Sequence, residues 1–352
     1  MDIEKKDRLG SYLMPHLSEM VFDELSESYL EKAGIKDILL DIPVPIKKTE
    51  MNNISVLSIA LNMAHVFGCD PGFKYRENYI EYILRNFDKR FAEGLIAQGV
   101  EMSQKEDFDN AVIKFRAALQ IDPDNANAYY CYGRACKDSY ERLDDEDLIG
   151  RFKAEALEAF EVATIKNSEL AEAYYFLGYA YLNMGLYVKA KLTWQEYLNI
   201  IEKKYAGNAV SSLTGKESDE LKKTIEEITE RLTQLEEPVK IEEGYNLVVS
   251  GKFEEGIKVL EPYKESDFKT WWPLYHYLGT AYQEIGNLDE AEKCYLEVLK
   301  LSPSNQDTME NLIKIYEETD NKEKIEKYKN KLKIVQENVE LDREEKSKTK
   351  LN

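Results

Sequence analysis

The chain has 352 residues, which at about one domain per 150 residues predicts two or three domains. It carries 67 acidic against 47 basic residues, a net charge of −20, and 43% of its residues are hydrophobic. That apolar fraction is enough for a sizeable core and argues against wholesale disorder. Because binders of nucleic acid or of anionic membranes need a basic face, we expect neither as a partner.

Helix breakers are scarce: the sequence has 17 Gly and 9 Pro, and no proline between Pro123 and Pro238. This predicts a mostly helical chain. The start of the sequence has no apolar core typical of a signal peptide, and no run of about 18 apolar residues is present. The four cysteines form no CxxC pair, so we expect buried thiols and a cytoplasmic protein.

Within residues 1–90, "MPHLSEMVFDELSESYLEKAGI" (14–35) is interpreted as an amphipathic helix ending near Gly34. "DILLDIPVPIKK" is expected to be extended, because its two prolines exclude a helix. "MNNISVLSIALNMAHVFG" predicts an apolar helix stopped by Gly68, and "YRENYIEYILRNFDKRF" leads into the next region. Two interpretations stay open for residues 1–90: a helical cap on the rest of the chain, or a separate recognition module. A DNA-binding helix-turn-helix is not favoured, because these residues show no basic recognition face.

A repeat begins after residue 90, marked by glycines that are each followed at a fixed distance by a second small residue. In four units that distance is twelve residues, whereas in the unit of Gly133 the next small residue, Ala156, lies 23 residues later, an insertion of 11 residues. The marking glycines are Gly99, Gly133, Gly178, Gly244 and Gly279.

This spacing predicts pairs of helices. A small residue in the first helix faces a small residue in the second, so the two axes approach closely, while large residues such as Tyr174, Tyr181 and Trp194 fill the space around them. A single pair cannot bury its apolar face, but stacked pairs can.

The pattern resembles the tetratricopeptide repeat family over about residues 91–335. The best match is "YHYLGTAYQEIGNLDEAEKCYLEVLKLSPSN" (275–305), and "LIAQGVEMSQKEDFDNAVIKFRAALQIDPDN" (95–125) is nearly as good. The resemblance implies an all-α fold: a right-handed α-solenoid of stacked helix-turn-helix repeats, here with an N-terminal helical cap.

The expected layout comes from the repeat phase. "YAGNAVSSLTGKESD" is interpreted as a loop, the helix after it carries an apolar stripe (Leu221, Ile225, Ile228, Leu232, Leu235), and the sixth repeat is degenerate. The segments, in order, are a cap or recognition segment (1–90), repeats 1–3 (91–204), the loop and extra helix (205–236), repeats 4–6 (237–339) and a disordered tail (340–352).

Catalytic motifs are missing from the sequence. The three histidines are far apart, no HExxH, GxSxG or phosphate loop occurs, and "ERLDDEDL" (141–148) lacks the alternation and the glycine of a calcium loop. We therefore expect no enzyme, no catalytic residue, no metal site and no cofactor.

In the resembled family the first helix of each repeat lines a concave groove. Counting from the small positions, the aromatic, cationic and amide residues on that face give the peptide-binding groove that we expect: Asn127, Tyr130, Arg134, Lys137, Tyr175, Tyr179, Asn183, Tyr245, His276 and Gln283. Ile96, Val100 and Val248 are expected on the same face. The cations suit a carboxylate of a peptide and the amides suit its backbone. Whether the tyrosines bind a ligand or pack between repeats stays open.

The sequence thus favours a non-enzymatic protein-interaction adaptor, or scaffold, that binds a partner peptide or helix in the groove. Two alternatives remain: a regulator that senses a small signalling peptide, and an assembly or helper subunit that grips an enzyme through residues 1–90. The identity of the partner and the oligomeric state are not predicted.

Overall fold

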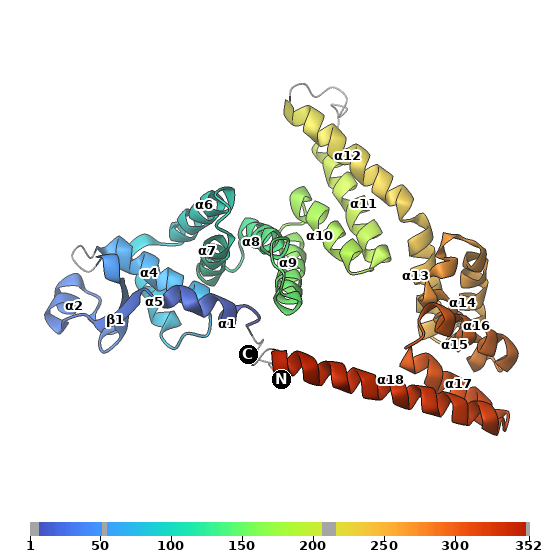
Figure 1. Ribbon diagram of the computed structural model, residues 1–352. Helices are drawn as coiled ribbons and strands as arrows, with labels where there is room; N and C mark the ends of the chain where they lie inside the picture. The colour runs from blue at the N-terminus through green and yellow to red at the C-terminus, as the bar shows by residue number, and fades with distance from the viewer. Residues whose placement is uncertain (1–6, 51–54, 206–215, 350–352) are drawn as a thin grey trace. The chain divides into compact units, whose positions relative to one another are not determined.

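The computed structural model describes residues 7–50, 55–205 and 216–349, without the side chains of residues 50, 216–218 and 339–349. The loop expected over "YAGNAVSSLTGKESD" lies largely outside these residues. Within the described ranges the chain is helical apart from one two-stranded sheet, which confirms the expected all-α class (Figure 1). It forms two compact units: unit 1 comprises Met1–Gly185 with Leu192–Ile225, and unit 2 comprises Leu186–Lys191 with Glu226–Asn352.

The N-terminal part of unit 1 mixes short elements with two longer helices. In order these are α1 (Gly10–Leu13), η1 (Met14–Leu17), β1 (Met20–Glu24), α2 (Glu27–Ala33), α3 (Lys36–Leu39), β2 (Pro43–Lys47), η2 (Lys48–Glu50), α4 (Val56–Cys69) and α5 (Arg76–Phe87).

Helix pairs come next, at the expected spacing. In unit 1 they are α6 (Arg90–Gln104) with α7 (Phe108–Ile121), α8 (Ala126–Tyr140) with α9 (Glu146–Lys166), and α10 (Ala171–Asn183) with α11 (Tyr187–Lys204), whose first residues up to Lys191 are assigned to unit 2. Those in unit 2 are α13 (Glu236–Val249) with α14 (Phe253–Leu260), α15 (Trp272–Glu284) with α16 (Leu288–Leu301), and α17 (Gln306–Glu318) with α18 (Lys322–Thr349). The turns η4 (Glu261–Glu265) and η5 (Asp267–Thr270) join α14 to α15.

Each marking glycine lies where its helix meets the partner helix. A Cβ added to Gly99, Gly133 or Gly279 would come within 2.7 Å of the ring of Phe115, Phe160 or Tyr295 respectively. Gly178 is closer still to the indole of Trp194. The small residues therefore set how closely the two helices of a pair approach, as the sequence pattern indicates.

The long helix expected over residues 14–35 is wrong. Its first half forms the short 3-10 helix η1 and strand β1, and only α2 is α-helical, begun by the Ser26 side chain that accepts from the Tyr29 N–H and ended by Gly34 at φ +68°. β1 pairs with β2 antiparallel, with Val21 opposite Ile46. The pairing of β1 with the distant strand β2 outweighs the local helical pattern, because Val and Phe in β1 also favour a strand.

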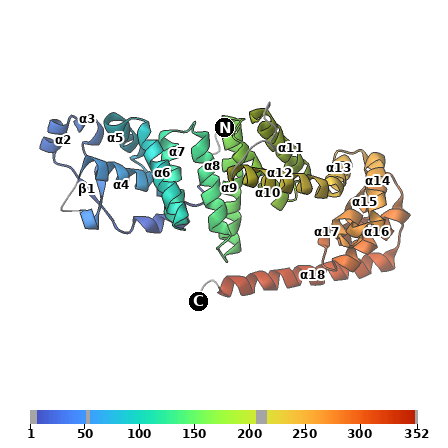
Figure 2. The ribbon, with the colours of Figure 1, turned by 90° about the horizontal axis from the view of Figure 1, so that it is seen from above.

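The extended segment predicted from the prolines is correct, since β2 carries Pro43 and Pro45. Both strands are edge strands, where proline is tolerated. Helix α4, in contrast, continues past Gly68 to Cys69. A Cβ at Gly68 would collide with the backbone oxygen of Ile113 in α7, so this glycine permits close packing of α4 on α7 and does not stop the helix. Two views show α4 and α5 on the side of α7 away from α8 (Figures 1 and 2).

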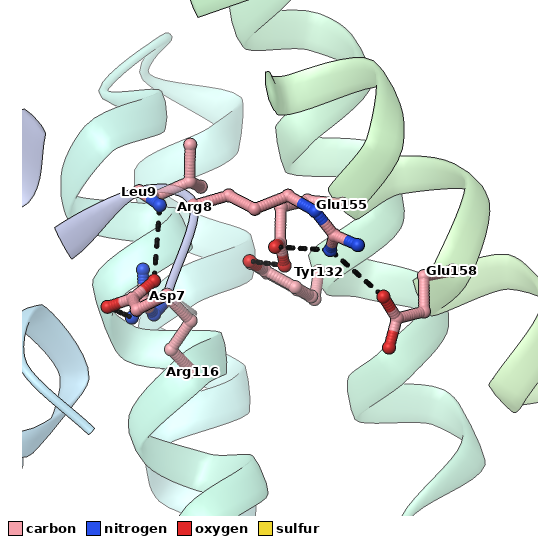
Figure 3. A network of polar contacts seen from close by, with 7 residues as sticks. All are labelled: Asp7, Arg8, Leu9, Arg116, Tyr132, Glu155 and Glu158. Atoms are coloured by element: carbon pink, nitrogen blue, oxygen red, sulfur yellow. Dashed lines mark hydrogen bonds and ion pairs between the residues drawn. The ribbon is translucent and has the colours of Figure 1, made fainter. Parts of the chain in front are cut away.

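The chain before α1 ties two helix pairs together through an ionic network (Figure 3). Arg116 of α7, only 6% exposed, donates from Nη2 to Asp7 Oδ2 at 2.6 Å. Arg8 Nη1 donates to Glu155 and Glu158 of α9, both at 2.9 Å. Asp7 therefore binds α7 and its neighbour Arg8 binds α9, and the segment fixes the first helix pair against the second.

The extra helix is α12 (Lys216–Gln234). Of its apolar stripe, Ile228 is fully buried and Leu221, Ile225 and Leu232 are half-buried, which fits the predicted amphipathic pattern. Helix α18 extends to Thr349, into the segment expected to be a disordered tail; residues 350–352 lie outside the described part.

Candidate functional site

Helices α8 and α10 position seven of the ten expected groove residues in unit 1. Gly133 and Gly178 turn one face of each helix toward its partner helix. Residues three before or one after a glycine then lie on the adjoining face. This places Tyr130 and Arg134 on α8, and Tyr175 and Tyr179 on α10, along one surface that we call the α8–α10 face.

Aromatic rings form the floor of this face. Phe160 of α9 and Phe176 of α10 stack with their centroids 5.8 Å apart, and the ring of Tyr130 lies 6.5 and 6.1 Å from them. Desolvation by burial raises the pKa of the Tyr130 hydroxyl, so this group is a neutral donor at physiological pH. Phe176 was not among the residues expected on the groove face, although it lies two residues before the marking Gly178.

Arg134 crosses this floor. Its guanidinium carbon lies 4.2 Å above the centre of the Phe176 ring, a cation–π geometry. Nη1 donates to the Tyr130 hydroxyl at 3.4 Å, and Nη2 lies 4.0 Å from the Asp138 carboxylate. Nε is buried and, among the residues that the structure describes, has no hydrogen-bond partner. Since the side chain is still 39% exposed, the guanidinium is oriented by the rings and remains open to an incoming acceptor.

The two tyrosines of α10 are engaged with other rings. Tyr175 and Tyr179 lie 5.2 Å apart, Tyr179 contacts Trp194 at 4.9 Å, and Tyr175 contacts Tyr197 at 5.8 Å. Trp194 is itself fixed, because its Nε1 donates to the Tyr175 carbonyl at 3.1 Å. These tyrosines therefore pack within the α10–α11 pair, and only their half-exposed edges contribute to the surface.

Lys137 and Asn183 meet at a small cavity of about 50 Å³. That volume has room for a carboxylate or a methyl group and not for an aromatic ring. Lys137 Nζ donates to Glu141 Oε1 at 2.5 Å, so its charge is partly neutralised. Asn127 lies in the first turn of α8 and is exposed. The cavity is lined by Lys137, Tyr140, Lys153, Ala156, Leu157, Phe160, Phe176, Tyr179, Ala180, Asn183 and Met184.

The other three expected residues lie in unit 2 and form a group of their own. The rings of Tyr245 and Tyr277 are 4.3 Å apart. His276 Nδ1 lies 3.0 Å from Thr308 Oγ1, and Gln283 Oε1 accepts from the Tyr295 hydroxyl at 3.0 Å. Burial lowers the pKa of His276. The side chains of His276 and Gln283 are thus used inside the repeat stack.

For two further residues, the expected position on the groove face is wrong. Ile96 and Val248 are both buried in the core, at 8% and 4% exposure. Both side chains are apolar and lie close to the contact between the two helices of their pair, so they pack into the core and do not face the groove.

Other chemistry finds little support in the described part of the chain. No group of three or more His, Cys, Asp and Glu side chains there could hold a metal ion. Burial raises the pKa of the Cys69 and Cys294 thiols to about 12 and of Cys131 to about 11, which keeps them protonated and unreactive. In the same ranges no helix is long and apolar enough to cross a bilayer.

Comparison with known families finds two segments that match models of the tetratricopeptide repeat, residues 171–203 and 272–305. They correspond to the α10–α11 and α15–α16 pairs. The search of curated proteins finds no significant match.

Solved structures that resemble this chain include three that differ in how much of it they cover. The MamA protein is 17% identical over 70% of this chain and 93% of its own, with a TM-score of 0.28. The Sgt2 TPR domain from Aspergillus fumigatus is 20% identical over 41% and 80%, with a TM-score of 0.30. The P58(IPK) TPR domain is 11% identical over 90% and 87%, with a TM-score of 0.41. At TM-scores below 0.5 these likenesses carry no statement about how this chain is arranged.

Proposed function

Since the chain is a tetratricopeptide repeat protein, we propose that it is a non-enzymatic adaptor that binds a partner protein through the α8–α10 face. The bound element is a peptide segment with a carboxylate, supplied by an acidic side chain or by a chain terminus. Repeats of this kind supply interaction surfaces and no reactive groups of their own, which fits the missing catalytic motifs.

The state of Arg134 is the observation that carries this proposal. The guanidinium is held over an aromatic ring, has a buried Nε without a partner in the described part of the chain, and keeps 39% of its side chain open. A pre-oriented guanidinium loses little entropy on pairing with a carboxylate, and pairs of this type are among the stronger hydrogen bonds. Nearby Asp138 is 4.0 Å away, too far to satisfy it fully.

The remaining features favour a narrow, shallow ligand. The small cavity beside Lys137 and Asn183 accepts a carboxylate or a short apolar tip. The edges of Tyr130 and Tyr179 offer apolar contact at low entropy cost. The exposed amides of Asn127 and Asn183 are placed to bond a peptide backbone.

A phage-displayed random peptide library, panned against the full chain, tests this proposal. We expect selected peptides to be enriched in Asp or Glu. For a selected peptide, Arg134→Met should weaken the dissociation constant about tenfold or more, the cost of one charged hydrogen-bonding pair.

Arg151 of α9 provides the matched control. Its side chain is 40% exposed and it pairs with Asp147, but it contacts Ser11 before η1, away from the α8–α10 face. Arg151→Met should leave peptide affinity within about twofold. Equal losses in both variants, or selection of basic peptides alone, would remove the proposal.

A further inference from the structure

A second, unrelated cavity lies in the N-terminal part of unit 1. It is a wide, open depression with a volume of about 420 Å³, large enough for a small organic anion. It sits where the ends of both strands meet η1, α4 and α7, so it belongs to residues outside the repeat signature, except for α7. Its lining residues are Pro15, His16, Ser18, Glu19, Met20, Lys47, His65 and Asn110.

Two lysines at this place lack a negative partner. Lys47 lines the cavity at the end of β2, and Lys114 lies on α7 one turn after the lining residue Asn110. Lys114 is only 9% exposed. In the part of the chain that the structure describes, neither ammonium group forms an ion pair or a hydrogen bond.

The nearby carboxylates are committed elsewhere or solvated. Asp109 accepts from the Tyr12 hydroxyl at 3.0 Å and lies 3.5 Å from His16 Nε2. Asp107 accepts from the Asn110 amide at 3.0 Å. Glu19 lines the cavity but is exposed. None of these offsets the charge of the buried Lys114.

Lys114 keeps its positive charge at neutral pH. Desolvation, reinforced by Lys47, lowers the pKa of Lys114 to about 8, so this lysine is still mostly protonated at pH 7. Burial with the two lysines nearby lowers the pKa of His65 to about 4, so His65 is neutral. A buried charge without a partner is costly, and a bound anion offsets that cost.

We propose that this cavity binds a small molecule carrying a compact oxyanion, a phosphate or a carboxylate group, with the ammonium groups of Lys47 and Lys114 as its charged contacts. The volume exceeds that of a bare ion and leaves room for a small organic group. This site is separate from the α8–α10 face, so either one can fail without the other.

Titration calorimetry of the full chain with inorganic phosphate, and separately with citrate, tests the assignment at constant ionic strength set with sodium chloride. We expect saturable binding of at least one anion and a rise in melting temperature with its concentration. Binding of phosphate alone identifies the phosphate group, and binding of citrate alone identifies the carboxylate; both results support the site.

The variants Lys114→Met and Lys47→Gln should each weaken the anion about tenfold or more. Lys114→Met should also melt no lower than the wild-type chain in the absence of anion, because it removes an unpaired buried charge. Lys48→Gln is the matched control: Lys48 is adjacent, donates to the Ser18 carbonyl, and is exposed. The affinity of Lys48→Gln for the anion should stay within about twofold of the wild-type value.

Failure of both anions to saturate the wild-type chain would overturn the proposal. So would unchanged affinity in Lys47→Gln, a substitution at a half-exposed position that leaves the core intact.

Discussion

Units 1 and 2 use the same two positions of a repeat in different ways. One residue after the marking glycine, unit 1 has Arg134, whose buried Nε has no partner among the described residues, whereas unit 2 has Thr280, which donates to the His276 carbonyl and lies 3.3 Å from the Tyr295 hydroxyl. Three residues before that glycine, Tyr130 contacts a cluster of phenylalanines, whereas His276 bonds Thr308 of the next pair. A groove position is therefore available for binding only where the stack itself does not use its polar group.

The largest expected effect is a loss of stability at the contacts between the two helices of a pair, where units 1 and 2 can be compared directly. Gly178→Ala should destabilise the chain by about 3 kcal/mol, because the added methyl meets an indole fixed by its hydrogen bond. Gly279→Ala in unit 2 should cost about 1–2 kcal/mol, since Tyr295 stands farther away at 2.7 Å. Urea denaturation followed by circular dichroism measures both.

Gly94→Ala is the control for these two, because nothing lies within 4 Å of an added Cβ there and alanine favours the helix by up to about 1 kcal/mol. Equal losses at Gly178 and Gly279 would show that the two pairs pack equally tightly, against this account.

A second difference concerns the histidines and appears as pH dependence. His65 in unit 1 has its pKa lowered to about 4 by burial and nearby lysines. The unfolded chain takes up a proton near pH 6.5 while the folded chain does not, so this contribution to stability is present above that pH and is lost as pH falls. Between pH 7 and pH 5 the loss is about 2 kcal/mol.

His65→Gln should remove that part of the pH dependence, seen as a smaller difference in the free energy of unfolding between pH 7 and pH 5. His276→Gln should remove less, because Asp307 acts against the lowering of the His276 pKa. An identical pH profile for wild type and His65→Gln would contradict the burial argument.

A smaller effect is expected at Gln283. Gln283→Leu removes the acceptor of the Tyr295 hydroxyl and should lower the free energy of unfolding by about 1 kcal/mol, measured by urea denaturation. Peptide affinity should not change, because this side chain works inside the stack. A loss of peptide affinity without a loss of stability would place the binding surface in unit 2 as well.

The helix pairs could be predicted from the sequence because their signal is local: small residues at fixed spacing determine which faces meet. The paired strands could not, because β1 is separated from β2 by two helices and its residues also fit a helical pattern. The contact of Asp7 with Arg116 spans 109 residues and leaves no local trace.

The candidate site was predicted only in part for a related reason. Position in the repeat identified Tyr130 and Arg134 but equally identified His276 and Gln283, whose internal hydrogen bonds depend on Thr308 and Tyr295 in other helices. Ile96 and Val248 were wrongly placed on the open face because counting along one helix ignores what packs over it.

In this view Arg134 serves a partner, whereas the residues expected on the groove face in unit 2, such as Gln283, serve the stack. Fluorescence anisotropy of a selected acidic peptide tests it most directly, with the wild-type chain, Arg134→Met and Gln283→Leu measured side by side. We expect the dissociation constant to be about tenfold or more weaker for Arg134→Met and unchanged for Gln283→Leu. Unchanged affinity for Arg134→Met in a folded chain would contradict it.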